Sequence, residues 1–424
     1  MKPFQSLIIL ALAMSGAVHA AHAATEAVAI ENATVHVERG KKLERATVLI
    51  KDGVIAAVGN SVQVPAGTRR IDGTGKVVTA GLVDSFTVLG LVEVGLVKST
   101  NEGAFPGGES AVHAAYRVTD GYNPASIAIP VARAGGVTQV ITVPRGGLVS
   151  GMSAWVTLGH DRTLKEVTVL DPVAMHVALG EEALASASGS RGKALERLRE
   201  LLDDAAQYSR RRDAFERNQM RRLAASRLDL EALAQVVQGK LPLVVRVDRA
   251  ADIMAAVKLA TELNVRVIIA GGTEAWMVAT HLARAKVPVI LNPMENLPSS
   301  FDRVHVRDDA AAILVQAGVA VALSTMEEAM MVRTLRQAAG NAVAQGLSWD
   351  DALAAVTSVP AALFGLKGRG VLKEGAAADL VLWSGDPFEL STRAEKAWIG
   401  GAPQPMGNRQ DLLREQYRGG TKAE

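Results

Sequence analysis

Through the centre of the chain, short apolar runs alternate with longer stretches of helical periodicity. The apolar runs lack polar alternation, as expected of parallel strands that helices bury on both faces. This rhythm and the length of the chain predict an α/β fold, a TIM-like (β/α)₈ barrel. A doubly wound sheet is the alternative, but its glycine-rich dinucleotide fingerprint is absent from the sequence. The expected strands are residues 137–143, 174–179, 243–247, 265–270, 287–291 and 319–323, and the expected helices are 252–263, 274–285, 308–316 and 327–346.

Both ends of this central region have a different pattern, in which short β-branched runs are separated by turn residues. Residues 28–78 contain Asp52-Gly53 and Pro65-Ala66-Gly67 between such runs, and the pattern returns over residues 370–401. Short strands punctuated by turns indicate antiparallel sheet. We therefore predict a composite β-sandwich module whose two parts are residues 24–78 and residues 359–424, the latter including a tail, on either side of a barrel at residues 79–358.

A charged, helical segment interrupts the predicted barrel at about residues 191–238. Apolar residues recur there at helical spacing, and the opposite face carries arginines such as Arg210 and Arg221. This pattern is typical of long amphipathic helices. Charge runs usually form a solvated face, so a lid or an oligomer-facing helix is the expected role.

The first 23 residues have the pattern of a secretory signal peptide. A short positive start precedes the apolar run Leu7–Ala13, and small residues follow, with cleavage expected after Ala20 or Ala23. A membrane anchor is the alternative, but the apolar run is too short to cross about 30 Å of hydrocarbon. We expect an exported protein, periplasmic or extracellular, with no membrane span after signal removal.

Composition excludes several classes of function. The chain contains no cysteine, so disulfides, thiolate metal sites and thiol nucleophiles are impossible. Its formal net charge is +2 and only 4% of its residues are aromatic, with no basic tract that interleaves aromatic side chains. These features argue against a nucleic-acid partner.

Several segments occur in the order typical of one known family. The chain resembles the imidazolonepropionase-like branch of the amidohydrolase superfamily through residues 77–84 (VVTAGLVD), 129–138 (IPVARAGGVT), 143–152 (VPRGGLVSGM), 271–276 (GGTEAW) and 378–388 (ADLVLWSGDPF). This resemblance implies the barrel and the composite module. It also implies hydrolysis of carbon–nitrogen bonds by one or two divalent metals, usually zinc, held at the C-terminal mouth of the barrel.

The resemblance also indicates where the metal ligands would lie, and this sequence departs from the family pattern at those positions. The family has His-x-His after strand one, where Phe86 and Val88 stand here. Arg246 occupies the strand-five position, Gly271 the strand-six position, and Met326 replaces the aspartate after strand eight. Strand four offers only His176 and Glu181. None of the replacements at Phe86, Val88, Arg246, Gly271 and Met326 is a metal ligand, so we predict no bound metal and no other cofactor.

Other polar residues are expected at the barrel mouth. Arg246 and Asp248 lie two apart on one strand and share a face, so they are expected to pair with each other or with a neighbouring carboxylate. Alternatively, Arg246 clamps an anionic small molecule beside an apolar wall of Phe86, Val88 and Met326. Possible further polar contributors are Glu93, Glu274, Thr325 and Glu327.

Together these features predict an exported pseudo-hydrolase with a ligand-binding or partner role. Possible partners are a small molecule, further copies of the chain, or an active paralogue in a hetero-oligomer. The alternative is an active hydrolase of carbon–nitrogen bonds that uses a non-standard site built on Glu93, Asp248 and Glu327.

Overall fold

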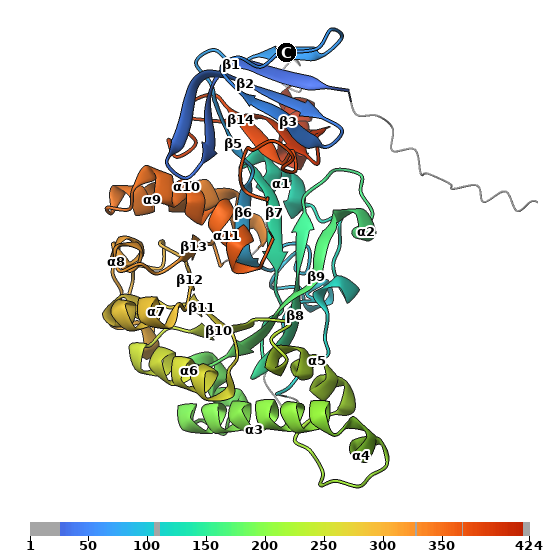
Figure 1. Ribbon diagram of the computed structural model, residues 1–424, viewed down its shortest axis with the longest axis vertical. Coiled ribbons are helices and arrows are strands. Elements are labelled where there is room, and N and C mark those ends of the chain that lie inside the picture. The colour runs from blue at the N-terminus through green and yellow to red at the C-terminus, as the bar shows by residue number, and fades with distance from the viewer. Residues whose placement is uncertain (1–25, 106–110, 327–328, 367, 419–424) are drawn as a thin grey trace, which may run out of the picture.

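The structure, a computed structural model, describes residues 26–105, 111–326, 329–366 and 368–418. Two eight-stranded sheets organise these residues. Figure 1 shows one sheet at the top of the molecule and the other below it, with helices around the second. No helix of the described residues is long and apolar enough to cross a membrane. The predicted signal peptide lies outside the described residues.

The first sheet combines strands from both ends of the chain. Its order is β16-β15-β14-β5-β1-β2-β3, and β4 pairs with β1. The joining pair is antiparallel, because β14 runs along β5 with Leu380 opposite Ala80. The strands are β1 (Val28–Glu38), β2 (Lys41–Lys51), β3 (Val54–Gly59), β4 (Arg69–Asp72), β5 (Val77–Ala80), β14 (Leu380–Trp383), β15 (Ala394–Ile399) and β16 (Ala402–Gln404).

The second sheet is a nearly closed barrel whose strands follow one another in sequence order, so the predicted barrel is confirmed. All six predicted central strands are present within two residues of their expected starts, except β9, which begins earlier. The strands are β6 (Leu82–Thr87), β7 (Val137–Thr142), β8 (Val149–Thr157), β9 (Thr168–Ala178), β10 (Leu243–Val247), β11 (Val267–Gly271), β12 (Val289–Leu291) and β13 (Val321–Leu323).

Strand β8 was not predicted, and it breaks the parallel pattern. It is antiparallel to both β7 and β9. Gly146 and Gly147, with φ of 92° and 69°, lie in the short link between β7 and β8. Glycine adopts positive φ without the penalty of a Cβ, so the chain reverses here without a crossover helix.

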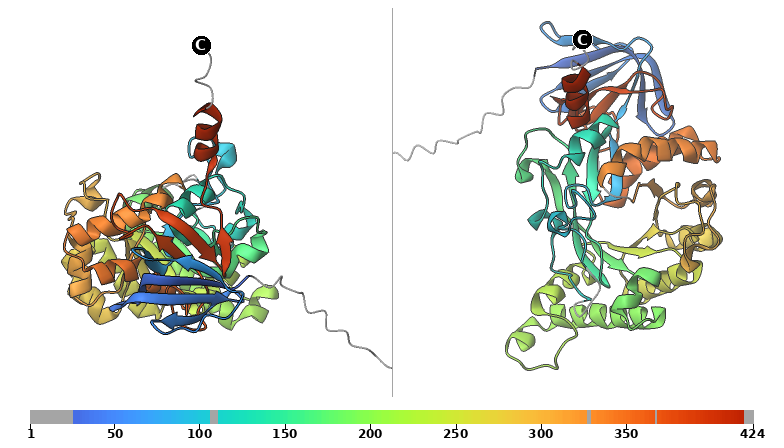
Figure 2. Two further views of the ribbon diagram at one scale, coloured as in Figure 1. Left: turned by 90° about the horizontal axis from the view of Figure 1, so that it is seen from above. Right: turned by 180° about the vertical axis from the view of Figure 1, so that it is seen from behind.

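Most of the helices lie around the barrel, and α12 lies beside the first sheet (Figure 2). They are α1 (Ala128–Ala134), α2 (Leu164–Val167), α3 (Arg191–Arg210), α4 (Arg212–Glu216), α5 (Arg227–Val237), α6 (Ala250–Leu263), α7 (Ala279–Ala285), α8 (Ala310–Gln316), α9 (Leu335–Ala344), α10 (Trp349–Ala355), α11 (Ser358–Leu363) and α12 (Arg409–Arg418). The helix expected at 274–285 is divided into the 3-10 helix η4 (Ala275–Val278) and α7. The helix expected at 327–346 is divided into η6 (Ala329–Thr334) and α9, and its first two residues lie outside the described residues.

The charged segment folds as the helices α3, α4 and α5, which Figure 2 shows at the end of the molecule away from the first sheet. Ser190 caps α3 by accepting from the Lys193 N–H. Charged side chains on the outer face pair with one another, as in Lys193–Glu196 and Arg197–Glu200. These pairs are solvent-exposed, as expected of a solvated face.

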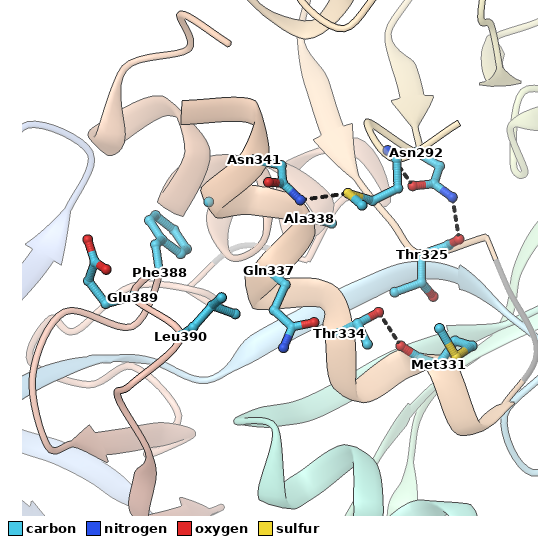
Figure 3. Close-up of a pocket in the computed structure, with 12 residues that line it drawn as sticks. Asn292, Thr325, Met331, Thr334, Gln337, Ala338, Asn341, Phe388, Glu389 and Leu390 are labelled. Carbon is cyan, nitrogen blue, oxygen red and sulfur yellow. Dashed lines mark hydrogen bonds between the residues drawn. The ribbon is translucent and has the colours of Figure 1, made fainter. Parts of the chain in front are cut away.

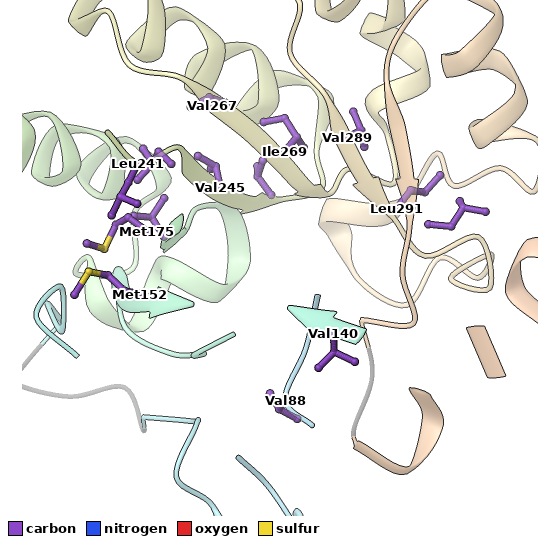
Figure 4. Packing of buried hydrophobic residues seen from close by; sticks show 14 of the residues in the cluster. Val88, Val140, Met152, Met175, Leu241, Val245, Val267, Ile269, Val289 and Leu291 are labelled. Atoms are coloured by element: carbon purple, nitrogen blue, oxygen red, sulfur yellow. The ribbon is translucent and has the colours of Figure 1, made fainter. Parts of the chain in front are cut away.

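Three groups of buried apolar side chains stabilise the fold. The largest lies between the barrel strands and their helices, and Figure 4 shows part of it, including Val245, Ile269 and Val289. A second fills the first sheet around Ile30 and Leu380. The third lies inside the barrel. Alternation along the strands separates the first group from the third, because successive side chains point to opposite faces.

Candidate active site at the barrel mouth

Strand β10 shows how the barrel presents side chains at its mouth. Val244 belongs to the cluster inside the barrel, whereas Val245 and Val247 belong to the cluster outside it. Arg246 and Asp248 follow Val244 at intervals of two residues, so they continue its inward face toward the C-terminal end of the strand. Both residues line one cavity at the mouth.

Phe86 occupies the centre of a group of side chains inside this mouth. Its ring lies 5.8 Å from the Arg246 Cζ and 5.9 Å from the Arg145 Cζ. The His176 ring lies edge-on to it at 5.6 Å between centroids. Both guanidinium groups are within the range at which a cation is attracted to an aromatic ring.

Met326 joins Phe86 in the same interior cluster, but Val88 does not. Met326 is 3% exposed, and its carbonyl oxygen accepts a hydrogen bond from Arg145 Nη2. Val88 is buried with Leu89 and Val140 in the cluster outside the barrel. The structure therefore brings two of the three expected apolar-wall residues together.

Arg246 and Asp248 pair with neighbouring charges and not with each other. Arg246 Nε lies 2.7 Å from Glu182 Oε1, and the Glu182 side chain is 48% exposed. The buried Nε–H of Arg246 has no hydrogen-bond partner among the described residues, so charge attraction alone joins the two groups. Asp248 accepts from Arg303 Nε at 3.0 Å and from the Thr273 N–H at 3.2 Å.

A cavity of about 360 Å³ opens beside these ion pairs. The loop between β12 and α8 supplies its far wall through Ser299, Ser300, Asp302 and Arg303. Burial by itself lowers the pKa of Arg303, but the facing carboxylates of Asp248 and Glu295 outweigh it and raise that pKa above its usual value. The remaining lining residues are Leu179, Glu181, Glu182, Arg246, Val247 and Asp248, so the wall carries charges of both signs.

His176, the expected strand-four candidate, is enclosed in the barrel. It is 3% exposed, and neither ring nitrogen has a hydrogen-bond partner among the described residues. Burial lowers the pKa of its imidazole to about 3, so the ring is neutral near pH 7. Glu181, the other strand-four candidate, is exposed, and its backbone N–H donates to Asp302 Oδ2.

The other expected polar contributors have separate roles. Glu274 accepts from the Ala250 N–H at the start of α6 and from the His305 N–H. Glu93 accepts from the Asn123 amide. Gly271 has φ of 87°, and a Cβ at this position would lie 2.7 Å from Asp248 Oδ1. Glu327 lies outside the described residues.

Sequence reasoning missed Asp84, the most enclosed carboxylate of the site. It accepts from Ser324 Oγ at 2.5 Å and from Thr325 Oγ1 at 2.6 Å, which joins β6 to the end of β13. Thr325 was expected to contribute to the mouth, and its hydroxyl instead helps to join the last strand of the barrel to the first. Burial raises the pKa of Asp84, although the hydrogen bonds from Ser324 and Thr325 oppose that rise. The available signal was a carboxylate within a strand that the barrel buries.

The described residues at the mouth offer no ligand set for a divalent metal. Within the described parts of the chain, no three histidine, cysteine, aspartate or glutamate side chains gather closely enough to hold a metal ion. Two guanidinium groups flank Phe86 at the position where the family resemblance places the first ligands. Fixed positive charges repel a divalent cation, so we derive no metal-dependent step for this site.

A nearly closed barrel joined to a second sheet of N- and C-terminal strands, with polar side chains gathered at the mouth, defines the class of amidohydrolase-like barrel proteins. The model of the amidohydrolase family matches residues 172–407, more than half of the chain. The chain belongs to the amidohydrolase family.

Two comparisons with individual proteins agree with this assignment. The chain is similar to the crystal structure of an amidohydrolase from Thermotoga maritima MSB8, with 27% identity, a TM-score of 0.81, and coverage of 89% of this chain and 99% of that chain. It is also 24% identical over 392 residues to amidohydrolase tasK of Hapsidospora irregularis, covering 84% of this chain. The match spans 39% of the length of tasK, so that protein's whole activity does not transfer.

More distant structures share the fold. A putative prolidase from Bifidobacterium longum aligns over 93% of this chain and 100% of its own, with 16% identity and a TM-score of 0.55. At this identity the likeness concerns architecture alone.

Proposed function

We propose that this chain is an exported, imidazolonepropionase-like amidohydrolase that has lost metal-dependent hydrolysis and binds a small anionic molecule at its barrel mouth. The observation that carries this proposal is the position of Phe86 between the guanidinium groups of Arg145 and Arg246. A metal in a hydrolase lowers the pKa of bound water and polarises the scissile carbonyl. An aromatic ring and two cations supply neither a ligand nor a suitable field for such an ion.

The described residues also offer no clear substitute for a metal-activated water. His176 is a weak base because burial lowers its pKa to about 3. Asp248 accepts hydrogen bonds from Arg303 and from the Thr273 N–H, so each of its carboxylate oxygens already has a donor. These contacts weigh against the alternative of an active hydrolase built on Glu93, Asp248 and Glu327.

Arg246 is the residue we assign to ligand binding. Its side chain is 16% exposed, and the ring of Phe86 supports its guanidinium group. Its partner Glu182 is half-exposed and therefore able to swing into solvent at little cost. A carboxylate entering the 360 Å³ cavity would then accept from the unsatisfied Nε–H.

Purified protein without a histidine tag is expected to contain no stoichiometric zinc or other divalent metal. It is also expected to show no turnover of a dihydropyrimidine, hydantoin and dipeptide panel, because no described ligand set positions an ion. Elemental mass spectrometry and product chromatography measure the two quantities. A metal-retaining amidohydrolase purified in parallel is the control.

Either of two results would contradict this prediction. About one metal per chain together with turnover would show that the chain is a metal-dependent enzyme. Turnover that survives EDTA and disappears in Asp248→Asn would favour the non-standard hydrolytic site.

Arg246→Gln is expected to weaken binding of N-acetylglycine about tenfold or more, the usual effect of losing a charged hydrogen bond. Calorimetric titration measures the affinity, and N-acetylglycinamide, which lacks the charge, is expected to bind weakly to both proteins. Arg199→Gln removes an exposed arginine paired with Glu262 and is the matched control. Equal affinity for the acid and the amide in the unmodified chain would refute the anion site.

A further inference from the structure

A second cavity lies away from the ion pairs of the barrel mouth, between the barrel and the C-terminal strands. Its volume is about 410 Å³. Figure 3 shows its three walls: the ends of β12 and β13 at Asn292 and Thr325, helix α9 at Gln337 and Asn341, and the loop that carries Phe388 and Leu390. Small-molecule sites occur preferentially at such joints, and this volume lies within their usual range.

Specific contacts hold the loop wall in place. Arg336 Nη1 donates to the carbonyl oxygens of Pro387 and Glu389, which fastens the loop to α9. Gly340 permits the close approach, because a Cβ there would lie 2.9 Å from the Phe388 carbonyl oxygen. The Phe388 ring also packs against Trp349 at 5.1 Å between centroids. The loop is therefore fixed by contacts outside the cavity, and its inner side needs no ligand to hold its shape.

The side chains that line the cavity favour one kind of ligand. Met294, Met331, Phe388 and Leu390 present apolar surface, and the first, second and fourth are more than 40% exposed. Glu389 is the one charged residue among the described lining residues. An apolar body suits the thioether and aromatic wall, and a cation suits a carboxylate at the rim.

Amide groups add hydrogen-bond acceptors beside this wall. The Asn341 Nδ2 donates to the Met294 sulfur, which leaves Asn341 Oδ1 as an acceptor. The Gln337 amide forms no hydrogen bond with the described residues, and it lies between Thr334 and Leu390 in Figure 3. Gln337 is half-buried, and half-buried amides are normally paired, so its amide is suited to a donor on a ligand.

We propose that this cavity binds a compact apolar molecule that carries one cationic, hydrogen-bond-donating head group. Its body lies against Phe388, Met294 and Met331, and its head group lies toward Glu389 and the amides of α9. This site is separate from the anion site at Arg246 in its residues and in the charge that it selects.

The test uses three probes of nearly equal shape: benzamidine, benzamide and benzoate, which are cationic, neutral and anionic. Ligand-observed NMR titration of the full chain is expected to give the order benzamidine, then benzamide, then benzoate. Glu389→Gln is expected to weaken benzamidine by roughly two- to fivefold, the range for an exposed charge pair, and to leave benzamide unchanged. Glu374→Gln removes an exposed carboxylate that does not line the cavity, and it should change the affinity for neither benzamidine nor benzamide.

A second variant fills the cavity. Gln337→Trp places an indole in the space and is expected to abolish benzamidine binding, while Gln345→Trp, at an exposed position just beyond α9, should preserve it. Unchanged thermal unfolding of both variants shows that the fold is intact. Equal binding of the three probes, or benzamidine binding retained in Gln337→Trp, would overturn the proposal. If Glu182→Gln abolished benzamidine binding while Glu389→Gln left it unchanged, the probe would bind at the barrel mouth, and the proposal would also be overturned.

Discussion

Replacing Gly136 by alanine is expected to lower the free energy of unfolding by about 3 kcal/mol or more. Gly136 lies directly before β7 with φ of 84°, and a Cβ there would lie 2.0 Å from Trp383 Cη2. Trp383 belongs to β14, is fully buried, and donates from Nε1 to Thr79 Oγ1 at 3.0 Å. The indole cannot retreat without losing this bond and its packing, so the joint between the two sheets must open.

Denaturant titration of the full chain measures this loss. Gly75→Ala is the matched control, because Gly75 has φ of 74° and nothing within 4 Å of an added Cβ. It isolates the cost of positive φ, about 1–2 kcal/mol. Equal losses in the two variants would show that backbone conformation, and not contact with Trp383, constrains position 136. A double variant with Trp383→Leu is expected to recover part of the additional loss, because it removes the colliding ring.

The sequence predicted the strands of the barrel because burial on both faces leaves a continuous apolar run, as in residues 243–247. Strand β8 was not predicted, because the residues before it do not distinguish a hairpin from a loop. Its residues 149–157 follow Gly146-Gly147, and a glycine pair after an apolar run is typical of an irregular loop as well as of a hairpin turn. Only the observed pairing of β8 with both β7 and β9 distinguishes these possibilities.

The side of the barrel on which Val88 lies could not be predicted from the alternation of side chains along a strand. The pairing of β6 with β7 is irregular between Asp84 and Thr87, so the strict two-residue period ends before position 88. One slip in register moves a side chain to the other face. Phe86 therefore lies inside the barrel, and Val88 lies among the residues outside it.

The ion-pair partners of Arg246 and Asp248 could not be predicted from the sequence either. Arg246 and Asp248 both line the cavity at the mouth, but their partners Glu182 and Arg303 lie in segments about 60 residues away in each direction. Neither segment has a hydrophobic period that fixes its path over the barrel. Loop conformation depends on tertiary contacts that local patterns do not encode.

Asp84→Ala is expected to destabilise the chain by about 3 kcal/mol or more, because it leaves several buried donors without an acceptor. Those donors are the hydroxyls of Ser324 and Thr325 and the N–H groups of Phe86 and Thr325. They connect the first and last barrel strands, so their loss weakens closure. Thermal and denaturant unfolding measure the effect, and Asp350→Ala, at a half-buried position in the first turn of α10, is the comparison.

Asp84→Asn separates the charge of this residue from its shape. Burial raises the pKa of Asp84 above its ordinary value of 3.8, so between that value and the raised pKa the folded state holds a proton that the unfolded state has released. The stability from this group is present below pH 3.8 and is lost as the pH rises through the folded pKa, with a slope of at most about 1.4 kcal/mol per pH unit. Asparagine does not titrate, so the stability of Asp84→Asn relative to the unmodified chain should increase from pH 4 to pH 7. Because all other titrating groups are common to both proteins, a relative stability that stays constant from pH 4 to pH 7 would mean that the hydrogen bonds from Ser324 and Thr325 outweigh burial and hold Asp84 ionised.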